Sequence, residues 1–253
     1  MRVNAVRDCF LLVLTACGGA LDATGYLKLH AFAANMTGNT VILGLNVGGR
    51  HVDAVWPPVV ALPAFALGAF AGAILGGEAD EDDPWPAQAL RAFLLEVLFL
   101  VALAWGWNHL ALPAEQQKLV LLGLAAVAMG IQSGIVHDVH HHGASTTYMT
   151  GTIARTFEYI ADTLRFGFKG GWVLNGLTWI VYVCAAVLVG ALDARGANLQ
   201  TVLWIVVAVV FVTGLVARPV VLAVKREQPP ERPPVPAASD REARDQARSP
   251  HAQ

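Results

Sequence analysis

The composition of this chain of 253 residues is 55% hydrophobic and only 14% charged, so it is more apolar and less charged than an ordinary soluble domain. Its formal net charge of -2 offers no basic field for nucleic acid, which excludes nucleic-acid binding as a leading function. Long uncharged runs indicate a membrane protein with the lipid bilayer as its main partner.

Six segments predict an all-α, polytopic membrane bundle of six transmembrane helices. A hydrocarbon core about 30 Å thick requires roughly 20 mostly apolar residues per helix. The first segment is the shortest, because residues 9–21 provide only 13 uncharged positions before Asp22. This helix must therefore start near Ala5 or carry Asp22 with it. The other five segments are 54–77, 92–114, 119–136, 170–192 and 196–217.

The first segment also has a second interpretation. Arg2 and Arg7 precede a short apolar run that ends in Leu14-Thr15-Ala16-Cys17-Gly18, which is similar to a lipoprotein cleavage box. A retained transmembrane helix is the favoured interpretation, since the internal repeat described below requires it.

The distribution of Lys and Arg predicts that both termini are cytoplasmic and that the protein lies in the inner membrane. With the N-terminus inside, the inner side collects more basic residues than the outer side, which holds only Lys28, Arg50, Lys118 and Arg195. Residues 225–253 are rich in Pro and in mixed charge, and they predict a disordered cytoplasmic tail.

The tripeptide Met36-Thr37-Gly38 recurs as Met149-Thr150-Gly151, an offset of 113 residues. Each copy has one apolar helix before it and two after it, so residues 1–115 and 116–224 are predicted to be two copies of one three-helix unit. Because three crossings are an odd number, the second copy must enter the membrane from the opposite side, as an inverted repeat.

Each repeat contains a short insert after its first helix. Residues 37–47 are apolar but too short to cross, which favours a half-helix or re-entrant segment. Residues 150–168 contain one apolar helical stripe, which is typical of a helix at the interface or packed under the bundle. Its members are Ile153, Phe157, Ile160, Leu164 and Phe168.

Four segments form a recognisable combination: GGALDA at 18–23, ANMTGNT at 34–40, GIQS at 130–133 and TTYMTGT at 146–152. In these segments the chain resembles the YoaK family of small bacterial membrane proteins of unknown function, with about six helices. The resemblance covers roughly residues 5–224 and implies a polytopic inner-membrane protein without assigning a reaction. After Gly134 the chain departs from the expected basic residues and carries His137-Asp138-Val139-His140-His141-His142.

Polar groups inside or beside the spans are the candidate binding residues. A carboxylate within a span usually faces a partner or a cavity, although Asp22 could also cap the chain reversal after the first helix. The repeated Met-Thr-Gly segments could aim helix amides at an anionic solute, or serve only as turns and packing motifs. The predicted substrate-binding residues are Asp22, Asn35, Thr37, Gly38, Asn39, Gln132, Thr150 and Gly151.

Other features have weaker interpretations. His137, His140 and His141 share a helical face, but with no second ligand cluster a histidine-rich loop is favoured over a metal site. Glu96 is interpreted as an interfacial residue. The ridge Gly68, Gly72 and Gly76 favours close helix packing or a homodimer.

The sequence contains no phosphate loop, HExxH or GxSxG motif, so we expect neither an enzyme nor a cofactor. The inverted repeat favours a secondary transporter or channel-like permease for a small molecule or ion. The alternatives are a membrane scaffold that transports nothing and, least favoured, an intramembrane enzyme using the histidines.

Overall fold

The computed structural model describes residues 2–77, 79, 83–139, 149–167 and 172–227, and in these residues all regular structure is helical. The predicted tail begins too early, because Lys225 and Arg226 still belong to helix α8, and its remainder at 228–253 lies outside the described residues, as do the histidines at 140–142. The helices are α1 (Arg2–Leu29), α2 (Met36–Gly48), the 3-10 turn η1 (Val52–Val55), α3 (Trp56–Gly76), α4 (Ala89–His109), α5 (Ala114–Val139), α6 (Met149–Phe166), α7 (Trp172–Ala194) and α8 (Leu199–Arg226).

Six of these helices are long and apolar enough to cross a membrane, which confirms the predicted number of spans. They are α1, α4, α5, α7, α8 and η1 continued by α3. The doubtful first segment is a single helix of 28 residues that includes Asp22. Its residues Leu14 and Leu21 are buried in the core, so α1 is an integral part of the bundle.

The bundle is built around α1 and α5, which are its most buried spans. On α5 pack α3 and α4, while on α1 pack α7 and α8, and α1 and α5 also contact each other. The spans α3 and α7 lie outermost and leave most of their apolar surface exposed, as lipid-facing helices do.

The predicted glycine ridge of α3 packs inside the chain, against α5. Gly68 and Gly72 lie on the backbone carbonyls of Val127 and Ile131, and Gly134 of α5 approaches α3 in return. A Cβ at Gly134 would lie only 2.5 Å from the carbonyl oxygen of Ala69. Because α5 covers this ridge, a homodimer would have to use a different face of the molecule.

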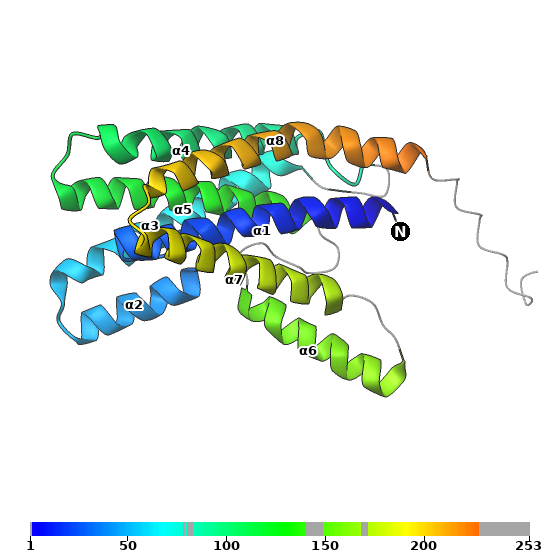
Figure 1. Cartoon of the computed structure of the whole chain (residues 1–253), viewed down its shortest axis with the longest axis horizontal. Helices are drawn as coiled ribbons and strands as arrows, with labels where there is room; N and C mark the ends of the chain where they lie inside the picture. Colours follow the sequence, from blue (N-terminus) through cyan, green and yellow to red (C-terminus); the bar gives the residue numbers. More distant parts are fainter. Residues whose placement is uncertain (1, 78, 80–82, 140–148, 168–171, 228–253) are drawn as a thin grey trace, which may run out of the picture.

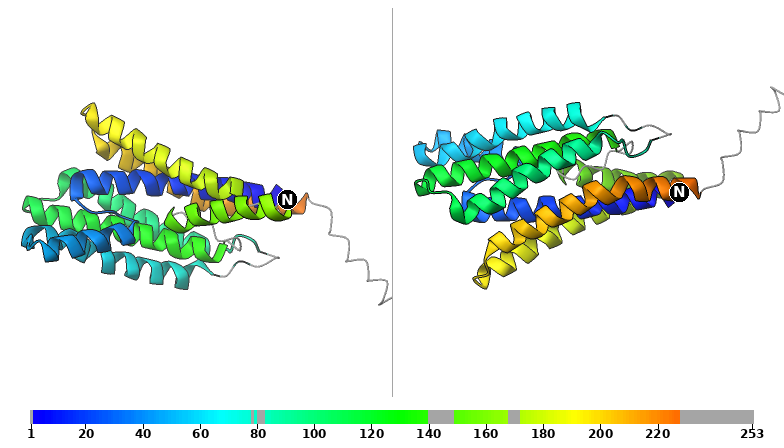
Figure 2. Two further views of the ribbon diagram at one scale, coloured as in Figure 1. Left: turned by 90° about the horizontal axis from the view of Figure 1, so that it is seen from below. Right: turned by 90° about the horizontal axis from the view of Figure 1, so that it is seen from above.

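Both ends of the described chain lie at the same end of the bundle (Figure 1). An even number of crossings requires this arrangement, and the structure has 6 candidate spans. The two short helices lie outside the bundle on one side, α2 beside α3 and α6 beside α7 (Figures 1 and 2). From the middle of the bundle α2 runs toward one end and α6 toward the other (Figure 1).

Candidate functional site

The site begins at the break between α1 and α2. Helix α1 ends at Leu29, and His30 adopts a left-handed backbone conformation with φ of 61° that turns the chain back toward the bundle. The carboxylate of Asp22, 3% exposed, accepts hydrogen bonds from the backbone N–H groups of Ala34 (2.6 Å) and Asn35 (3.4 Å). Asp22 therefore holds the returning loop beside its own position on α1.

Tyr182 of α7 is the third donor to Asp22. Its hydroxyl donates to the second carboxylate oxygen, so the carboxylate links α1, the loop and α7. Directly beside this link, Gly19 of α1 lies against the backbone carbonyl of Tyr182. Both oxygens of the carboxylate are thus hydrogen-bonded, which offsets the loss of water around Asp22. Sequence reasoning missed Tyr182, because one tyrosine in an apolar span has many ordinary roles.

Two asparagines fix the start of α2. Asn35 is the N-cap, and its side chain accepts a hydrogen bond from the Gly38 N–H at 2.9 Å. Asn39 is 0% exposed and makes two hydrogen bonds of 2.8 Å to the backbone of Phe32 in the loop. Its Oδ1 accepts from the Phe32 N–H, and its Nδ2 donates to the Phe32 carbonyl oxygen. Thr37 is exposed between them, and the described residues provide no acceptor for its backbone N–H.

The second Met-Thr-Gly copy repeats this pattern of burial at the start of α6. Thr150 is exposed like Thr37, and Gly151 is half-buried like Gly38. Thr152, 1% exposed, occupies the position that corresponds to Asn39. The sequence prediction omitted Thr152, although the offset of 113 residues would have found it from Asn39.

The first turns of α2 and α6 approach each other from opposite directions. In both figures the beginnings of α2 and α6 lie outside the packed spans, near the middle of the bundle's length, and the two helices run from there toward opposite ends, α2 beside α3 and α6 beside α7 (Figures 1 and 2). The free amides of a helix start carry partial positive charge. The arrangement therefore directs two such ends toward one region.

Gln132 lies apart from this region, in the packed core. It is fully buried on α5, and its Nε2 donates to the carbonyl oxygen of Leu14 at 3.3 Å. Leu14 is eight residues before Asp22, about 12 Å along α1 at 1.5 Å per residue. The structure therefore groups Asp22, Asn35, Thr37, Gly38 and Asn39 at the α2 start, places Thr150 and Gly151 at the α6 start, and leaves Gln132 between α5 and α1.

The inner side of α7 carries further polar groups that sequence reasoning missed. Asn175 and Thr178 are buried on this mostly exposed helix, and they precede Tyr182 at helical spacing. The side-chain oxygen of Asn175 has no hydrogen-bond partner among the described residues. In the sequence these three residues were isolated polar positions in an uncharged span, and nothing indicated that they form one stripe.

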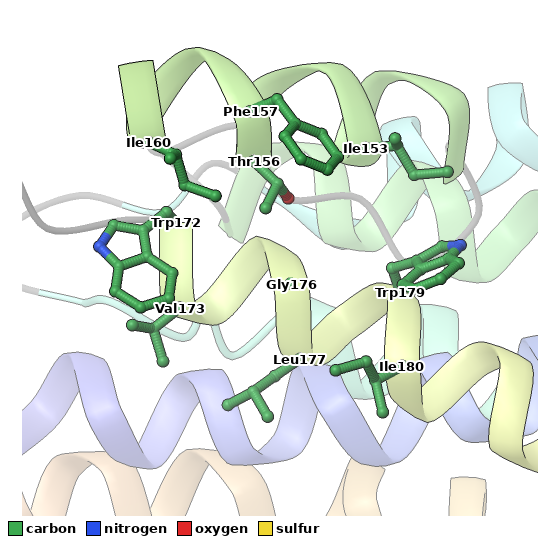
Figure 3. Close-up of a pocket in the computed structure, with 10 residues that line it drawn as sticks. All are labelled: Ile153, Thr156, Phe157, Ile160, Trp172, Val173, Gly176, Leu177, Trp179 and Ile180. Atoms are coloured by element: carbon green, nitrogen blue, oxygen red, sulfur yellow. The ribbon is translucent and has the colours of Figure 1, made fainter. Parts of the chain in front are cut away.

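A separate apolar hollow of about 420 Å³ lies between α6 and α7 (Figure 3). Trp172 and Trp179 flank Gly176, and Ile153 and Phe157 face them from α6 (Figure 3). Its one hydroxyl, on Thr156, already donates to the Thr152 carbonyl oxygen within α6. Such a lining matches hydrocarbon rather than a polar solute.

Two weaker predictions have different outcomes. Glu96 is fully buried on α4, so its interpretation as an interfacial residue was wrong. The described residues contain no group of three or more metal-ligating side chains. The predicted histidine cluster lies outside the described part of the chain, which includes neither residues 140–142 nor the side chain of His137.

The comparisons with known proteins agree with this architecture. The family described as protein of unknown function (DUF1275) matches residues 10–216. The UPF0700 transmembrane protein YoaK of Bacillus subtilis (strain 168) is 31% identical over 218 residues, which cover 83% of this chain and 94% of that protein. No solved structure matches.

Proposed function

The chain belongs to the DUF1275 family of membrane proteins, which includes YoaK, and from this premise we propose that it is a small secondary transporter or channel-like permease. The solute is a small polar molecule or ion with an anionic group. It binds between the starts of α2 and α6, on the side where α7 and α1 meet. The proposal assigns no reaction to the chain.

An inverted repeat is the first support for this proposal. Exchanging α1–α4 with α5–α8 preserves the main packing pairs: α3 on α5 becomes α7 on α1, α4 on α5 becomes α8 on α1, and α4 with α8 is unchanged. The pair α2 with α3 becomes α6 with α7. Three spans per half give the copies opposite directions, and inverted repeats are a common architecture of secondary transporters.

The observation that carries the proposal is that two half-helix starts approach each other from opposite directions near the middle of the bundle's length (Figures 1 and 2). In transporters with discontinuous helices, such starts point at anionic groups of the substrate near the middle of the bilayer. Here the exposed Thr37 and Thr150 supply hydroxyls, and Gly38 and Gly151 let a solute approach the backbone.

The predicted binding residues then have two roles. Thr37, Gly38, Thr150 and Gly151 contact the solute, whereas Asp22, Asn35 and Asn39 hold the α2 start in place through the hydrogen bonds described above. Gln132 steadies α5 against α1. Asp22→Asn should therefore change solute affinity indirectly, by loosening the loop.

A non-transporting scaffold is the second candidate, favoured by one observation. Asp22 and Asn39 bond to their own loop and to α7, which a purely structural turn would also require. In that case the half-helix starts stabilise the fold and bind no solute.

A solute screen separates the two functions. Purified protein in detergent is heated in the presence of inorganic anions, amino acids, sugars and metal ions, and hits are tested for uptake into proteoliposomes. A transporter should gain thermal stability from at least one anionic solute and should accumulate it. A scaffold should respond to none of the solutes.

Gly38→Leu tests the site with a matched control on the same helix. A side chain at Gly38 extends toward the Phe32 ring, whose nearest atom would lie 2.9 Å from the new Cβ, whereas Gly44 has open space around it. Gly38→Leu should weaken solute affinity at least tenfold, because it fills the approach to the α2 start. Gly44→Leu should leave the affinity unchanged. Equal responses of the two variants would contradict the proposed site.

A further inference from the structure

Glu96 is a buried acid that neither the packing nor the proposed solute site explains. It lies about 10 Å along α4 from Ala89 at 1.5 Å per residue, and its side chain is 0% exposed. Among the described residues neither of its two carboxyl oxygens has a hydrogen-bond partner. Asp22, by contrast, has donors from Ala34, Asn35 and Tyr182.

The charged groups around Glu96 do not neutralise it. Cys17 of α1 is close enough to interact with it electrostatically. Helix α3 carries no ionisable side chain, and in α5 Glu115 and Lys118 belong to the first turns and pair with each other. The side chains of His137 and Asp138 on α5 lie outside the described part of the chain. In α8, Arg218 pairs with Asp83, and Lys225 and Arg226 stand in the last turn.

Burial without donors makes the charged form of this group unfavourable. An ionised carboxylate loses its hydration in the core, and neither a hydrogen bond nor an ion pair within the described residues replaces it. A carboxylic acid that keeps its proton avoids most of this penalty. Acids inside membrane spans commonly belong to proton or ion pathways.

We propose that Glu96 is a proton-binding site of the bundle core. It is a neutral carboxylic acid in the packed arrangement, and loss of its proton to water is linked to opening of the core around Glu96, which includes the nearby Cys17 of α1. When the O–H bond breaks, one entering water takes up the proton and carries it away as hydronium, and further water that enters hydrates the new carboxylate. This inference is independent of whether the chain moves a solute.

Infrared spectroscopy tests the protonation state directly. Wild-type protein in vesicles at neutral pH should show the C=O stretch of a protonated carboxylic acid, shifted on transfer to deuterated water. Glu96→Gln should remove this band, because the amide has nearly the same shape and no titratable proton. Asp22→Asn, the matched control, should retain it. Absence of the band from wild type, or its persistence in Glu96→Gln, would overturn the proposal.

Cys17 provides a natural reporter of core opening. Cys9 and Cys184 are exposed and can be replaced by Ala, which leaves the buried Cys17 as the only thiol. The rate of its modification by a small water-soluble thiol reagent is measured from neutral to alkaline pH. Over this pH range, the increase in the modification rate should be at least tenfold larger with Glu96 present than in the Glu96→Gln variant, in which only the thiol itself titrates. Equal pH profiles would contradict the linkage.

Chemical modification of the native protein covers the case in which Glu96→Gln does not fold. Apolar carbodiimides react with protonated carboxyl groups inside membranes, so the peptide containing Glu96 should be labelled in wild type and labelled less at higher pH. Protection by sodium or potassium at constant pH would instead identify a cation as the ligand and would refute the proton site.

Discussion

At the scale of single residues, the Asp22 carboxylate is the point where three parts of the chain meet. It receives donors from the loop at Ala34 and Asn35 and from Tyr182 on α7. Removal of the acceptor leaves buried donors unsatisfied, which costs about 1–3 kcal/mol for each group. The energy of this junction is therefore concentrated in one side chain.

Substitutions of Asp22 and Tyr182 should show that most of the energy of this junction depends on Asp22. Asp22→Ala strands the Ala34 N–H and the Tyr182 hydroxyl, so we expect a loss of about 3 kcal/mol in unfolding free energy. Tyr182→Phe leaves the loop donors in place and should cost about 1 kcal/mol. The double variant should be no less stable than Asp22→Ala. Thermal unfolding in detergent measures all three variants.

Tyr26→Phe is the control for these variants. Tyr26 is exposed and stacks on Phe32 through its ring, so loss of its hydroxyl should leave the melting temperature unchanged. If Tyr182→Phe is also silent, or if the losses of Asp22→Ala and Tyr182→Phe simply add, the hydrogen bond between the two residues contributes nothing to stability.

The residues also show what the sequence could predict at this scale. Asp22 stood out because a charge in a span is rare, and the Met-Thr-Gly copies stood out because they repeat. Tyr182 and Glu96 could not be assigned, because their roles depend on which helix packs on which. A tyrosine becomes a donor only when α7 lies on α1, and an acid becomes buried only when neighbouring helices such as α5 and α8 pack on α4.

At the scale of helices, small residues decide how closely two spans approach. The pair α3 and α5 meets through glycines on both sides, with backbone against backbone. Without a hydrophobic difference between lipid and side chain, such contacts are a main source of helix association in membranes. The spacing of Gly68, Gly72 and Gly76 predicted a packing face, but only the fold shows that its partner is α5 of the same chain.

Gly134→Ala should separate this pair of helices. The new methyl group would lie 2.5 Å from the Ala69 carbonyl oxygen and 2.6 Å from the Ala73 amide nitrogen, and neither backbone atom can move alone. We expect a loss of about 1–3 kcal/mol, as for other overpacked sites. The expected result is a lower melting temperature and a lower yield of folded protein.

Gly190→Ala is the matched substitution on an open helix face. No atom lies within 4 Å of a Cβ at this position of α7, and alanine favours helix over glycine by about 1 kcal/mol. This variant should be as stable as wild type or slightly more stable. If Gly134→Ala and Gly190→Ala have the same melting temperature, the α3 and α5 backbones are farther apart than these distances require.

At the scale of the whole molecule, the proposed inverted repeat depends on the number of spans. Helix α1 begins and α8 ends at one end of the bundle, so the 6 spans return the chain to its starting side (Figure 1). The half-helices α2 and α6 run toward opposite ends, which is the arrangement that the proposed inverted repeat requires (Figure 1). Hydropathy alone predicted the spans, because length and apolar content determine them. It could not predict that the two half-helix starts approach each other near the middle of the bundle's length (Figure 1).

Reporter fusions should assign this end to the cytoplasm. The excess of Lys and Arg near it, which includes Arg91, Arg218 and Lys225, favours retention on the inner side. A reporter that is active only in the cytoplasm should therefore be active when it is fused after Gly77 or after Lys225. A fusion after Leu110, beyond α4, should be active only with a reporter that works outside the cytoplasm. Periplasmic signals from both of the first two fusions would show that the orientation is reversed. A periplasmic signal from only one of them would contradict the helix count. The second outcome would also remove the basis of the inverted repeat, because its halves would no longer contain an odd number of crossings each.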